Sequence, residues 1–382
     1  MMIRSWWALP VVVLALVGPP APVVSRPPAT STVSSPAGTF PACVTAAVET
    51  MSLEEQVGQT LMVGVPLHSP QGIGGLVAGY HLGGVFLSGR STRSSAGLRA
   101  DITALQRTAK VPLLVSVDQE GGSVQALQGT DFPDIPAATT LGAGPPDELR
   151  RTVRDSADRL AGIGVTVNLA PVADTVPSGT DDRNPPIGAF RRQYDSDPIK
   201  VAEDIRTVVA ASQGAGVLTI LKHFPGLGRV RANTDTSTRA VDRTATVDDP
   251  YLDPFRAGMR QDSAGVMISL ATYPRIDPAS IAAFSRPIVT GLLRERYAFT
   301  GLIMSDDLGA ADAVESVPTG DRAVRFLDAG GDLALTIRPQ NVGPMVAALL
   351  AAARTSPVFA ARVTDAASHV LAAKHRAGLL RC

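Results

Sequence analysis

The strongest constraint on the fold is a series of short, continuously apolar runs that alternate with segments of helical periodicity. Because the runs do not alternate apolar with polar residues, they are typical of strands buried on both faces of a parallel sheet. Between them, in segments such as 98–108, 149–161 and 199–215, apolar residues recur three or four positions apart, which predicts helices. The eight predicted strands span residues 61–65, 84–87, 113–117, 165–169, 217–221, 265–269, 302–304 and 333–336.

Eight buried strands separated by helical segments predict an α/β fold, a (β/α)8 barrel of the TIM type, as a single domain over residues 49–382. An open, doubly wound sheet would produce the same alternation. Its dinucleotide-binding form carries a G-x-G-x-x-G turn after a strand, and no strand of this sequence is followed by one. The barrel is therefore the favoured fold.

The first 48 residues follow a different pattern. Arg4 precedes an apolar run over 6–18 and a group of prolines, which is typical of a secretory signal peptide and predicts one over 1–25. The run is shorter than the ~20 residues of a spanning helix, so we expect no stable membrane span after cleavage, although an uncleaved anchor would also fit. Residues 26–48, rich in Pro, Ser and Thr, predict a linker. The protein is expected to be secreted or to lie in the cell envelope.

The charged residues and the metal-ligating residues exclude several function classes. Because 35 Lys+Arg balance 35 Asp+Glu, the chain has no excess positive charge with which to attract nucleic acid. Two Cys are too few for a four-cysteine zinc site or an iron–sulfur centre, and the five His show no H-x-x-x-H spacing. We therefore expect no nucleic-acid partner, no metal and no cofactor.

Polar residues follow several of the predicted strands. In a barrel of this type the carboxyl ends of the strands form the active-site face. The segments 118–120, 168–174, 222–223 and 305–307 bring carboxylates, an amide, a Lys and a His to that face. A turn or a helix cap would explain any one of them. Together they indicate an enzyme that binds a polyhydroxylated molecule.

Three of these segments resemble known motifs. Asp-Gln-Glu-Gly-Gly at 118–122, Lys-His-Phe-Pro-Gly at 222–226 and Met-Ser-Asp-Asp-Leu at 304–308 resemble the signature blocks of glycoside hydrolase family 3. More narrowly, they resemble the single-domain β-N-acetylglucosaminidases of bacterial peptidoglycan turnover, and the resemblance covers roughly residues 49–380. It implies a retaining β-glycosidase that works through a covalent glycosyl-enzyme.

The resemblance also assigns roles to residues of this chain. Asp306 matches the family's nucleophile, the first Asp of the Ser-Asp-Asp segment. Asp118, Arg192, Lys222 and His223 match positions that hold the hydroxyl groups of the sugar. Charged side chains suit that task because they make charge-assisted hydrogen bonds.

The proton donor departs from the family pattern. The acetylglucosaminidase branch carries Asp-Ser-His in the loop after the Lys-His-Phe block, with the His as acid/base, whereas this chain has Asn233-Thr234-Asp235 and no His between positions 223 and 369. Asp235 is therefore the candidate acid/base, with Asn233 orienting its loop. Alternatively Glu120, a supporting residue in the family, donates the proton, or the barrel binds cell-wall sugar without cleaving it.

Further departures leave the identity of the sugar open. Ser123 stands where an Arg is usual, and Leu227 and Leu270 stand where a His is common. These changes affect the preference for N-acetylglucosamine over glucose or xylose. The predicted function is that of an exported, monomeric β-N-acetylhexosaminidase acting on terminal β-linked sugars of cell-wall glycans. The alternative is a catalytically impaired sugar-binding protein of the envelope.

The two cysteines lie at opposite ends of the predicted folded region. A closed barrel brings its first and last elements side by side, and an exported protein meets an oxidising compartment. We therefore predict a disulfide between Cys43 and Cys382.

Overall fold

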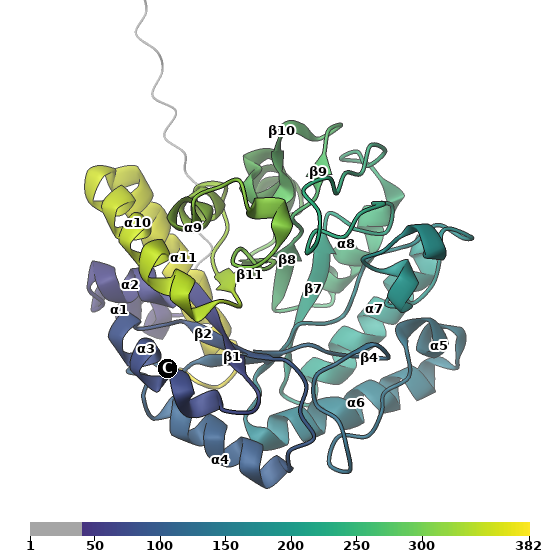
Figure 1. The fold of residues 1–382 in the computed structure, drawn as a ribbon, viewed down its shortest axis with the longest axis horizontal. Helices are drawn as coiled ribbons and strands as arrows, with labels where there is room; N and C mark the ends of the chain where they lie inside the picture. The colour runs from purple at the N-terminus through teal and green to yellow at the C-terminus, as the bar shows by residue number, and fades with distance from the viewer. Residues whose placement is uncertain (1–39) are drawn as a thin grey trace, which may run out of the picture. The chain divides into compact units, whose positions relative to one another are not determined.

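Eight parallel strands form a ring surrounded by helices in the computed structural model, which describes residues 40–382 (Figure 1). The predicted signal peptide over 1–25 lies outside the described residues. The hydrogen-bonded order of the strands is β11-β8-β7-β6-β3-β2-β1-β12. A parallel bridge between Met304 and Leu333 joins the two ends of this order and closes the ring. The strands are β1 (Leu61–Pro66), β2 (Gly84–Ser88), β3 (Leu114–Val117), β6 (Val167–Asn168), β7 (Leu218–Phe224), β8 (Gly265–Ile268), β11 (Leu302–Ser305) and β12 (Ala334–Thr336).

Strands that are consecutive around the ring are also consecutive along the chain, as in a (β/α)8 barrel. The last strand pairs with the first, with Leu61 opposite Ala334. In a doubly wound sheet the strand order would reverse at the first strand instead. The barrel prediction is confirmed, and each predicted strand overlaps one strand of the ring.

Helices surround the ring on its outer side (Figure 1). The predicted helices over 98–108, 149–161 and 199–215 correspond to α4, α6 and α7. The sequence marks the ends of these elements: Pro198 occupies the first turn of α7, the Asp197 carboxylate accepts from the N–H of Ile199 at 2.9 Å, and α6 ends at Gly164 with φ 92°. The helices are α1 (Ala42–Glu49), α2 (Leu53–Gln59), α3 (Gly74–Tyr80), α4 (Ser95–Gln106), α5 (Ala138–Ala143), α6 (Pro146–Ile163), α7 (Pro198–Gln213), α8 (Asp253–Arg260), α9 (Thr319–Asp328), α10 (Val342–Thr355) and α11 (Pro357–Arg376).

The apolar side chains form two layers. One layer lies between the strands and the helices and contains most of the core. The other fills the inside of the ring, because alternate residues of each strand point inward. Its buried members are Met62, Leu114, Val167, Leu169, Leu218, Ile220, Ala264, Met267, Leu302, Met304, Leu333, Leu335, Val370 and Ala373.

The end of α11 covers the amino ends of the strands. The Lys374 ammonium donates to Gln59 Oε1 at 2.5 Å, just before β1, and Arg376 Nη2 donates to the carbonyl of Asp262 at 2.7 Å, just before β8. Val370 and Ala373 of the same helix join the cluster inside the ring. The barrel is therefore closed at its amino-terminal end, which leaves the carboxyl end of the strands for a binding site.

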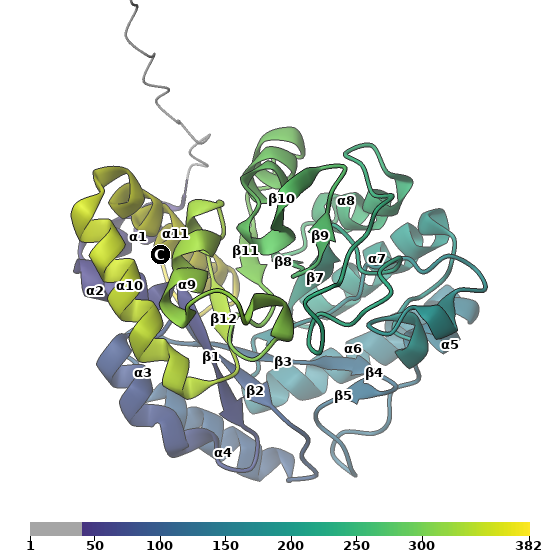
Figure 2. The ribbon, with the colours of Figure 1, turned by 45° about the horizontal axis from the view of Figure 1, so that its top comes forward.

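Two short hairpins extend from the carboxyl ends of strands (Figure 2). The first, β4 (Gln119–Gly121) with β5 (Val124–Gln125), follows β3 directly. The second, β9 (Thr272–Tyr273) with β10 (Asp277–Ile281), follows β8. Like the loop between β7 and α8, they are insertions into the strand–helix repeat. They lie at the carboxyl end of the barrel and form part of its rim.

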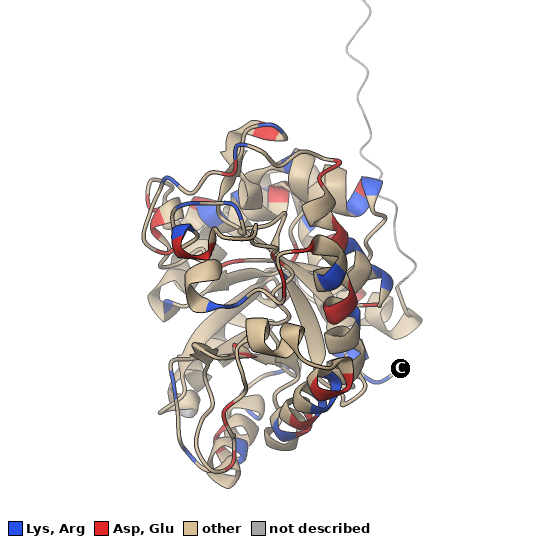
Figure 3. Cartoon of the chain, turned by 90° about the vertical axis from the view of Figure 1, so that its right-hand side faces the viewer, with Lys and Arg blue, Asp and Glu red and all other residues tan. Residues whose placement is uncertain are grey.

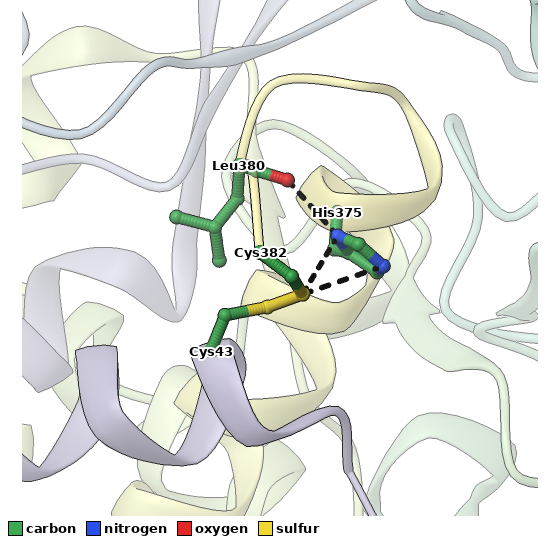
Figure 4. The surroundings of a disulfide bond; sticks show 4 residues. All are labelled: Cys43, His375, Leu380 and Cys382. Carbon is green, nitrogen blue, oxygen red and sulfur yellow. Dashed lines mark hydrogen bonds between the residues drawn. A yellow bond between two sulfur atoms is a disulfide. The ribbon is translucent and has the colours of Figure 1, made fainter.

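The two ends of the folded region lie side by side. Val44 and Val48 of α1 pack against Leu371 of α11. A disulfide joins Cys43 to Cys382 across 339 positions, as predicted, with His375 beside the sulfur of Cys382 (Figure 4). Helix α1 begins before residue 49, the predicted start of the barrel domain, so the folded part of the chain includes the end of the predicted linker over 26–48.

The surface of the described region gives two further observations. Lys and Arg are interspersed with Asp and Glu over the helices on the side drawn in Figure 3. Within residues 40–382, none of the helices combines the length and the apolar character needed to cross a bilayer.

Candidate active site

The predicted site residues lie at the carboxyl end of the barrel. Asp118 directly follows β3, and Glu120 lies in the hairpin strand β4. Lys222 and His223 belong to the end of β7, and Asp306 directly follows β11. Arg192 comes from the long connection between β6 and α7, where it follows the short helix η3 (Gly188–Phe190). Residues far apart in the sequence therefore meet because the strands end at one face.

Lys222 links two of the carboxylates. Its ammonium nitrogen lies 2.6 Å from Asp118 Oδ1 and 2.6 Å from Glu120 Oε1. Only 2% of Lys222 is exposed. Burial alone would lower its pKa, but the nearby charges of Asp118 and Glu120 outweigh that effect, so the pKa is raised and the side chain stays charged. A cation held in this way can donate to a sugar hydroxyl without changing its own position.

Glu120 is fixed by two cations. Arg192 donates to both of its oxygens, from Nε at 2.9 Å and from Nη2 at 2.7 Å, and Lys222 provides the third contact. Burial raises the pKa of Glu120, but the charges and hydrogen bonds of Arg192 and Lys222 overcome it and lower the pKa to about 2. An acid with this pKa is ionised at neutral pH. This geometry favours a role for Glu120 in positioning Arg192 and Lys222.

His223 is held by a carboxylate of the predicted segment 168–174, for which the sequence indicated no individual role. Asp174, which is fully buried, accepts from His223 Nδ1 at 2.7 Å and from the backbone N–H groups of His223 and Leu227. Because an ionised carboxylate only accepts, Nδ1 carries a proton that it donates to Asp174, and Nε2 lies 3.4 Å from Arg192 Nη2. The only signal for Asp174 was its place at the end of the loop after the fourth strand.

Asp306 lies in the mouth beside a second carboxylate. Its backbone N–H donates to the carbonyl of Ile268 at 3.0 Å, and its Oδ1 accepts from the N–H of Asp307 at 2.8 Å. Burial raises the pKa of Asp306 to about 6, with the charges of Asp235 and Asp307 acting in the same direction and His223 opposing them. The carboxylate is still predominantly ionised at neutral pH, which a nucleophile requires.

Asp307 is bonded to the backbone on all sides. Its Oδ1 accepts from the N–H groups of Gly309 at 2.8 Å and Ile337 at 2.9 Å, and its Oδ2 accepts from Ala310 at 2.9 Å. These bonds connect the turn after β11 to the residue that follows β12. Asp307 therefore shapes the turn that presents Asp306 and has little capacity left for a ligand.

Asp235 lies on a loop that docks against the nucleophile's own loop. Its carbonyl accepts from the N–H of Asp312 at 3.2 Å, and the carbonyl of Thr234 accepts from Ala313 at 3.1 Å. Asn233 Oδ1 accepts from the N–H of Asp235 at 3.0 Å, which fixes the turn locally. The Asp235 side chain is exposed, and its charge raises the pKa of both Asp306 and Asp307. The structure thus brings Asp235 and Asp306 into electrostatic contact.

The three other positions that depart from the family pattern, Ser123, Leu227 and Leu270, lie in different surroundings. Leu227 and Leu270 are buried in the core layer between strands and helices. Ser123 lies at the exposed tip of the β4–β5 hairpin, where its carbonyl accepts from Arg90 Nη2 at 2.7 Å. Two of the three substitutions therefore contribute to packing, and one leaves an open position on the rim of the mouth.

A carboxylate on the carboxyl face of a (β/α)8 barrel, a second carboxylate on a loop beside it, and fixed cations able to bind hydroxyl groups together define the site of a glycoside hydrolase. Comparison with known proteins agrees with this class. The sequence profile of the "Glycosyl hydrolase family 3 N terminal domain" matches residues 52–373. The chain belongs to glycosyl hydrolase family 3.

Three relatives show the branch of the family that it resembles. The crystal structure of a β-N-acetylhexosaminidase from Beutenbergia cavernae is 43% identical, with a TM-score of 0.83, and covers 85% of this chain and 99% of that one. A β-hexosaminidase of Xylella fastidiosa is 34% identical over 276 residues, which is 70% of this chain and 79% of the relative. One from Xanthomonas euvesicatoria is 32% identical over 274 residues, with the same coverage. The chain is a β-N-acetylhexosaminidase-like glycosidase.

Proposed function

We propose that this protein is an exported β-N-acetylhexosaminidase that removes terminal β-linked N-acetylhexosamine units from cell-wall glycans. The names of its relatives support the sugar class. The signal-like segment over 1–25 and the disulfide between Cys43 and Cys382 support export, because such bonds persist in oxidising compartments. The cell wall is then the nearest source of β-linked N-acetylhexosamine.

In the first step, Asp118, Arg192, Lys222 and His223 hold the hydroxyl groups of the terminal sugar. A carboxylate oxygen of Asp306 attacks the anomeric carbon, and the bond from that carbon to the leaving oxygen breaks. The proton on Asp235 moves to the leaving oxygen, which departs as an alcohol. The sugar is now joined to Asp306 as an ester of inverted configuration.

In the second step, the ionised Asp235 takes a proton from a water molecule. The oxygen of that water attacks the anomeric carbon, and the bond to Asp306 breaks. The sugar leaves with its original β configuration, Asp306 is again a carboxylate and Asp235 is again an acid. Atoms and charge balance over the two steps, and the chain's own side chains suffice for them.

The observation that carries this proposal is the placement of two carboxylates with different surroundings at one mouth. Asp306 is held by the turn after β11, while Asp235 lies exposed on a loop that is hydrogen-bonded to the continuation of that same turn. A nucleophile needs a fixed position, and an acid/base needs contact with both the leaving oxygen and water. The two residues fit these different needs.

The direct test is hydrolysis by the purified mature protein of nitrophenyl β-N-acetylglucosaminide, β-glucoside and β-xyloside. We expect release of nitrophenol from the first and much less from the other two. Asp306→Asn is the matched inactive control. If the protein binds N-acetylglucosamine oligosaccharides but releases nitrophenol from none of the three substrates, the sugar-binding alternative replaces the hydrolase.

A further inference from the structure

A hollow of about 440 Å³ on the rim of the barrel takes no part in the chemistry described above. It lies between the β4–β5 hairpin, the segment that leads into α5, and the residues around η3. The hairpin follows the carboxyl end of β3, and Arg191 on the hollow's wall precedes Arg192 of the active site. The hollow therefore lies at the same end of the barrel as Asp306.

Phe190 forms one wall of the hollow. Its side chain is 46% exposed, and it is the aromatic residue among the large apolar side chains that lie exposed in residues 40–382. Small-molecule sites are concave and are commonly lined by aromatic side chains. One face of a pyranose ring consists of C–H groups, which pack well on the flat face of a phenyl ring.

Arg191 is held in an unusual backbone conformation next to Phe190. Its φ is 56°, a left-handed conformation that non-glycine residues adopt rarely, and with it the short helix η3 ends. Its Nε donates to Thr139 Oγ1 and its Nη2 to Thr140 Oγ1, both at 3.0 Å. These bonds orient the guanidinium. They use two of its five N–H groups. The remaining donors are available to a ligand in the hollow.

Asp134 gives the hollow a matching acceptor. Its exposed carboxylate lines the same space as Arg191, together with Gln128 and Ser123. One cation and one anion leave the lining without net charge, so the hollow as a whole attracts neither anions nor cations. A neutral ring with several hydroxyl groups can accept from the guanidinium and donate to the carboxylate while it stacks on Phe190.

We propose that this hollow is a second sugar-binding subsite, which holds a further ring of the glycan whose terminal sugar lies at Asp306. The inference rests on the proposed function, because it makes the substrate an oligosaccharide and not a single glycoside. Ser123 supports it: its short side chain lies exposed at the tip of the hairpin, where it lines the hollow.

The test compares a short substrate with a long one. Phe190→Ala and Arg191→Met should each raise the KM for the β-1,4-linked tetrasaccharide of N-acetylglucosamine roughly 3- to 10-fold, the worth of one aromatic contact or one hydrogen bond. Both variants should keep the wild-type kcat and KM for nitrophenyl β-N-acetylglucosaminide, which is too short to occupy the hollow. Ile199→Ala, which removes another exposed apolar side chain outside the hollow, is the matched control.

A binding measurement separates this inference from the proposed function. In the inactive Asp306→Asn protein, calorimetric titration with the tetrasaccharide should show the same 3- to 10-fold weakening when Phe190→Ala is added. If the wild type hydrolyses no glycoside but this weakening is seen, the hydrolase proposal fails and the subsite stands. An unchanged KM and affinity for the tetrasaccharide, equal losses on both substrates, or no binding of the tetrasaccharide would overturn the subsite.

Discussion

The carboxylates of Asp306 and Asp307 differ in the number of hydrogen bonds that they accept. The Asp307 carboxylate is occupied by three backbone N–H groups, whereas within residues 40–382 the Asp306 carboxylate accepts only from the N–H of Asp307. Its oxygen is thus oriented but still has unused lone pairs, as a nucleophile needs. The identity of the reacting carboxylate is therefore decided by hydrogen-bond partners and not by residue type.

This difference predicts the outcome of covalent trapping. A 2-deoxy-2-fluoro glycoside slows the second step, so it should accumulate as an ester on a peptide containing Asp306. Asp306→Asn should lower kcat by about 10⁴-fold or more while leaving the melting temperature near that of the wild type, because the loss is one of chemistry. Peptide mass spectrometry after trapping checks the assignment. Labelling of Asp118 or Asp174 instead would refute it.

The role of Asp235 can be separated from simple positioning. A leaving group such as dinitrophenolate needs no proton, so Asp235→Ala should slow hydrolysis of alkyl glycosides about 10²- to 10⁴-fold and of dinitrophenyl glycosides far less. Azide should restore the second step with the activated substrate and give a β-glycosyl azide. Asn233→Ala is the control and should have a smaller effect, because its amide only orients the loop. Equal losses on both substrates without azide rescue would make Asp235 a structural residue.

The pH profile reports the coupling between the two carboxylates. A dinitrophenyl glycoside needs no proton from Asp235, so its hydrolysis depends on the ionisation of Asp306. Because the pKa of Asp306 is raised to about 6, kcat/KM for this substrate should fall as the pH falls through about 6, up to tenfold per pH unit below it. The negative charge of Asp235 contributes to that raised pKa. Asp235→Asn should therefore move the acid limb to lower pH, measured with a dinitrophenyl glycoside. An acid limb that stays in place would show that the two groups do not interact.

At the scale of secondary-structure elements, the sequence predicted the barrel because burial on both faces leaves a strong pattern. Each of the eight runs overlaps one strand of the ring, since a central parallel strand has no polar face. The small elements left no such pattern. The hairpins β4–β5 and β9–β10 and the π-helix over Pro287–Arg296 consist of short or mixed segments whose structure depends on their neighbours in space.

The site shows the same limit. Residues that directly follow strands, such as Asp118 and Asp306, could be predicted because a barrel places strand ends together. Asp174 could not be assigned to His223 because that contact spans 49 positions and arises from the packing of the loop after β6 against the end of β7. The contact of the Asp235 loop with Asp312 could not be predicted either, because it consists of backbone hydrogen bonds, which do not depend on the type of side chain.

The C-terminal helix α11 contains a buried lysine, Lys374, whose effect on the free energy of unfolding depends on pH. Lys374 is fully buried with Gln59 Oε1 as its hydrogen-bond partner, and burial lowers its pKa to about 7. Between about pH 7 and the ordinary lysine pKa near 10.4, the unfolded chain binds a proton that the folded chain does not, so this residue makes stability rise with pH by up to about 1.4 kcal/mol per unit.

Lys374→Met should remove that dependence. Relative to the variant, the wild type should gain about 2–3 kcal/mol between pH 7 and pH 9, measured as urea midpoints at both values. The constant offset between the two proteins also includes the loss of the hydrogen bond to Gln59, so the change with pH is the diagnostic quantity. Lys110→Met, at an exposed lysine, is the control. Parallel pH profiles for wild type and Lys374→Met would contradict the prediction.

At the scale of the whole molecule, the disulfide closes nearly the entire folded chain into one loop. In the chain-entropy model a loop of about 100 residues is already worth about 4.7 kcal/mol, and the value grows only slowly with length. Cys382→Ser should therefore lower the melting temperature by several degrees, and a reducing agent should bring the wild type to the same value. Because the bond lies beside α11 and away from the mouth, KM for an aryl glycoside at 25 °C should not change.

Cys43→Ser should match Cys382→Ser, since either change opens the same loop. Two free thiols in the denatured, unreduced wild type, or a variant that melts with the wild type, would show that the ends of the barrel are held by the packing of α1 on α11 alone.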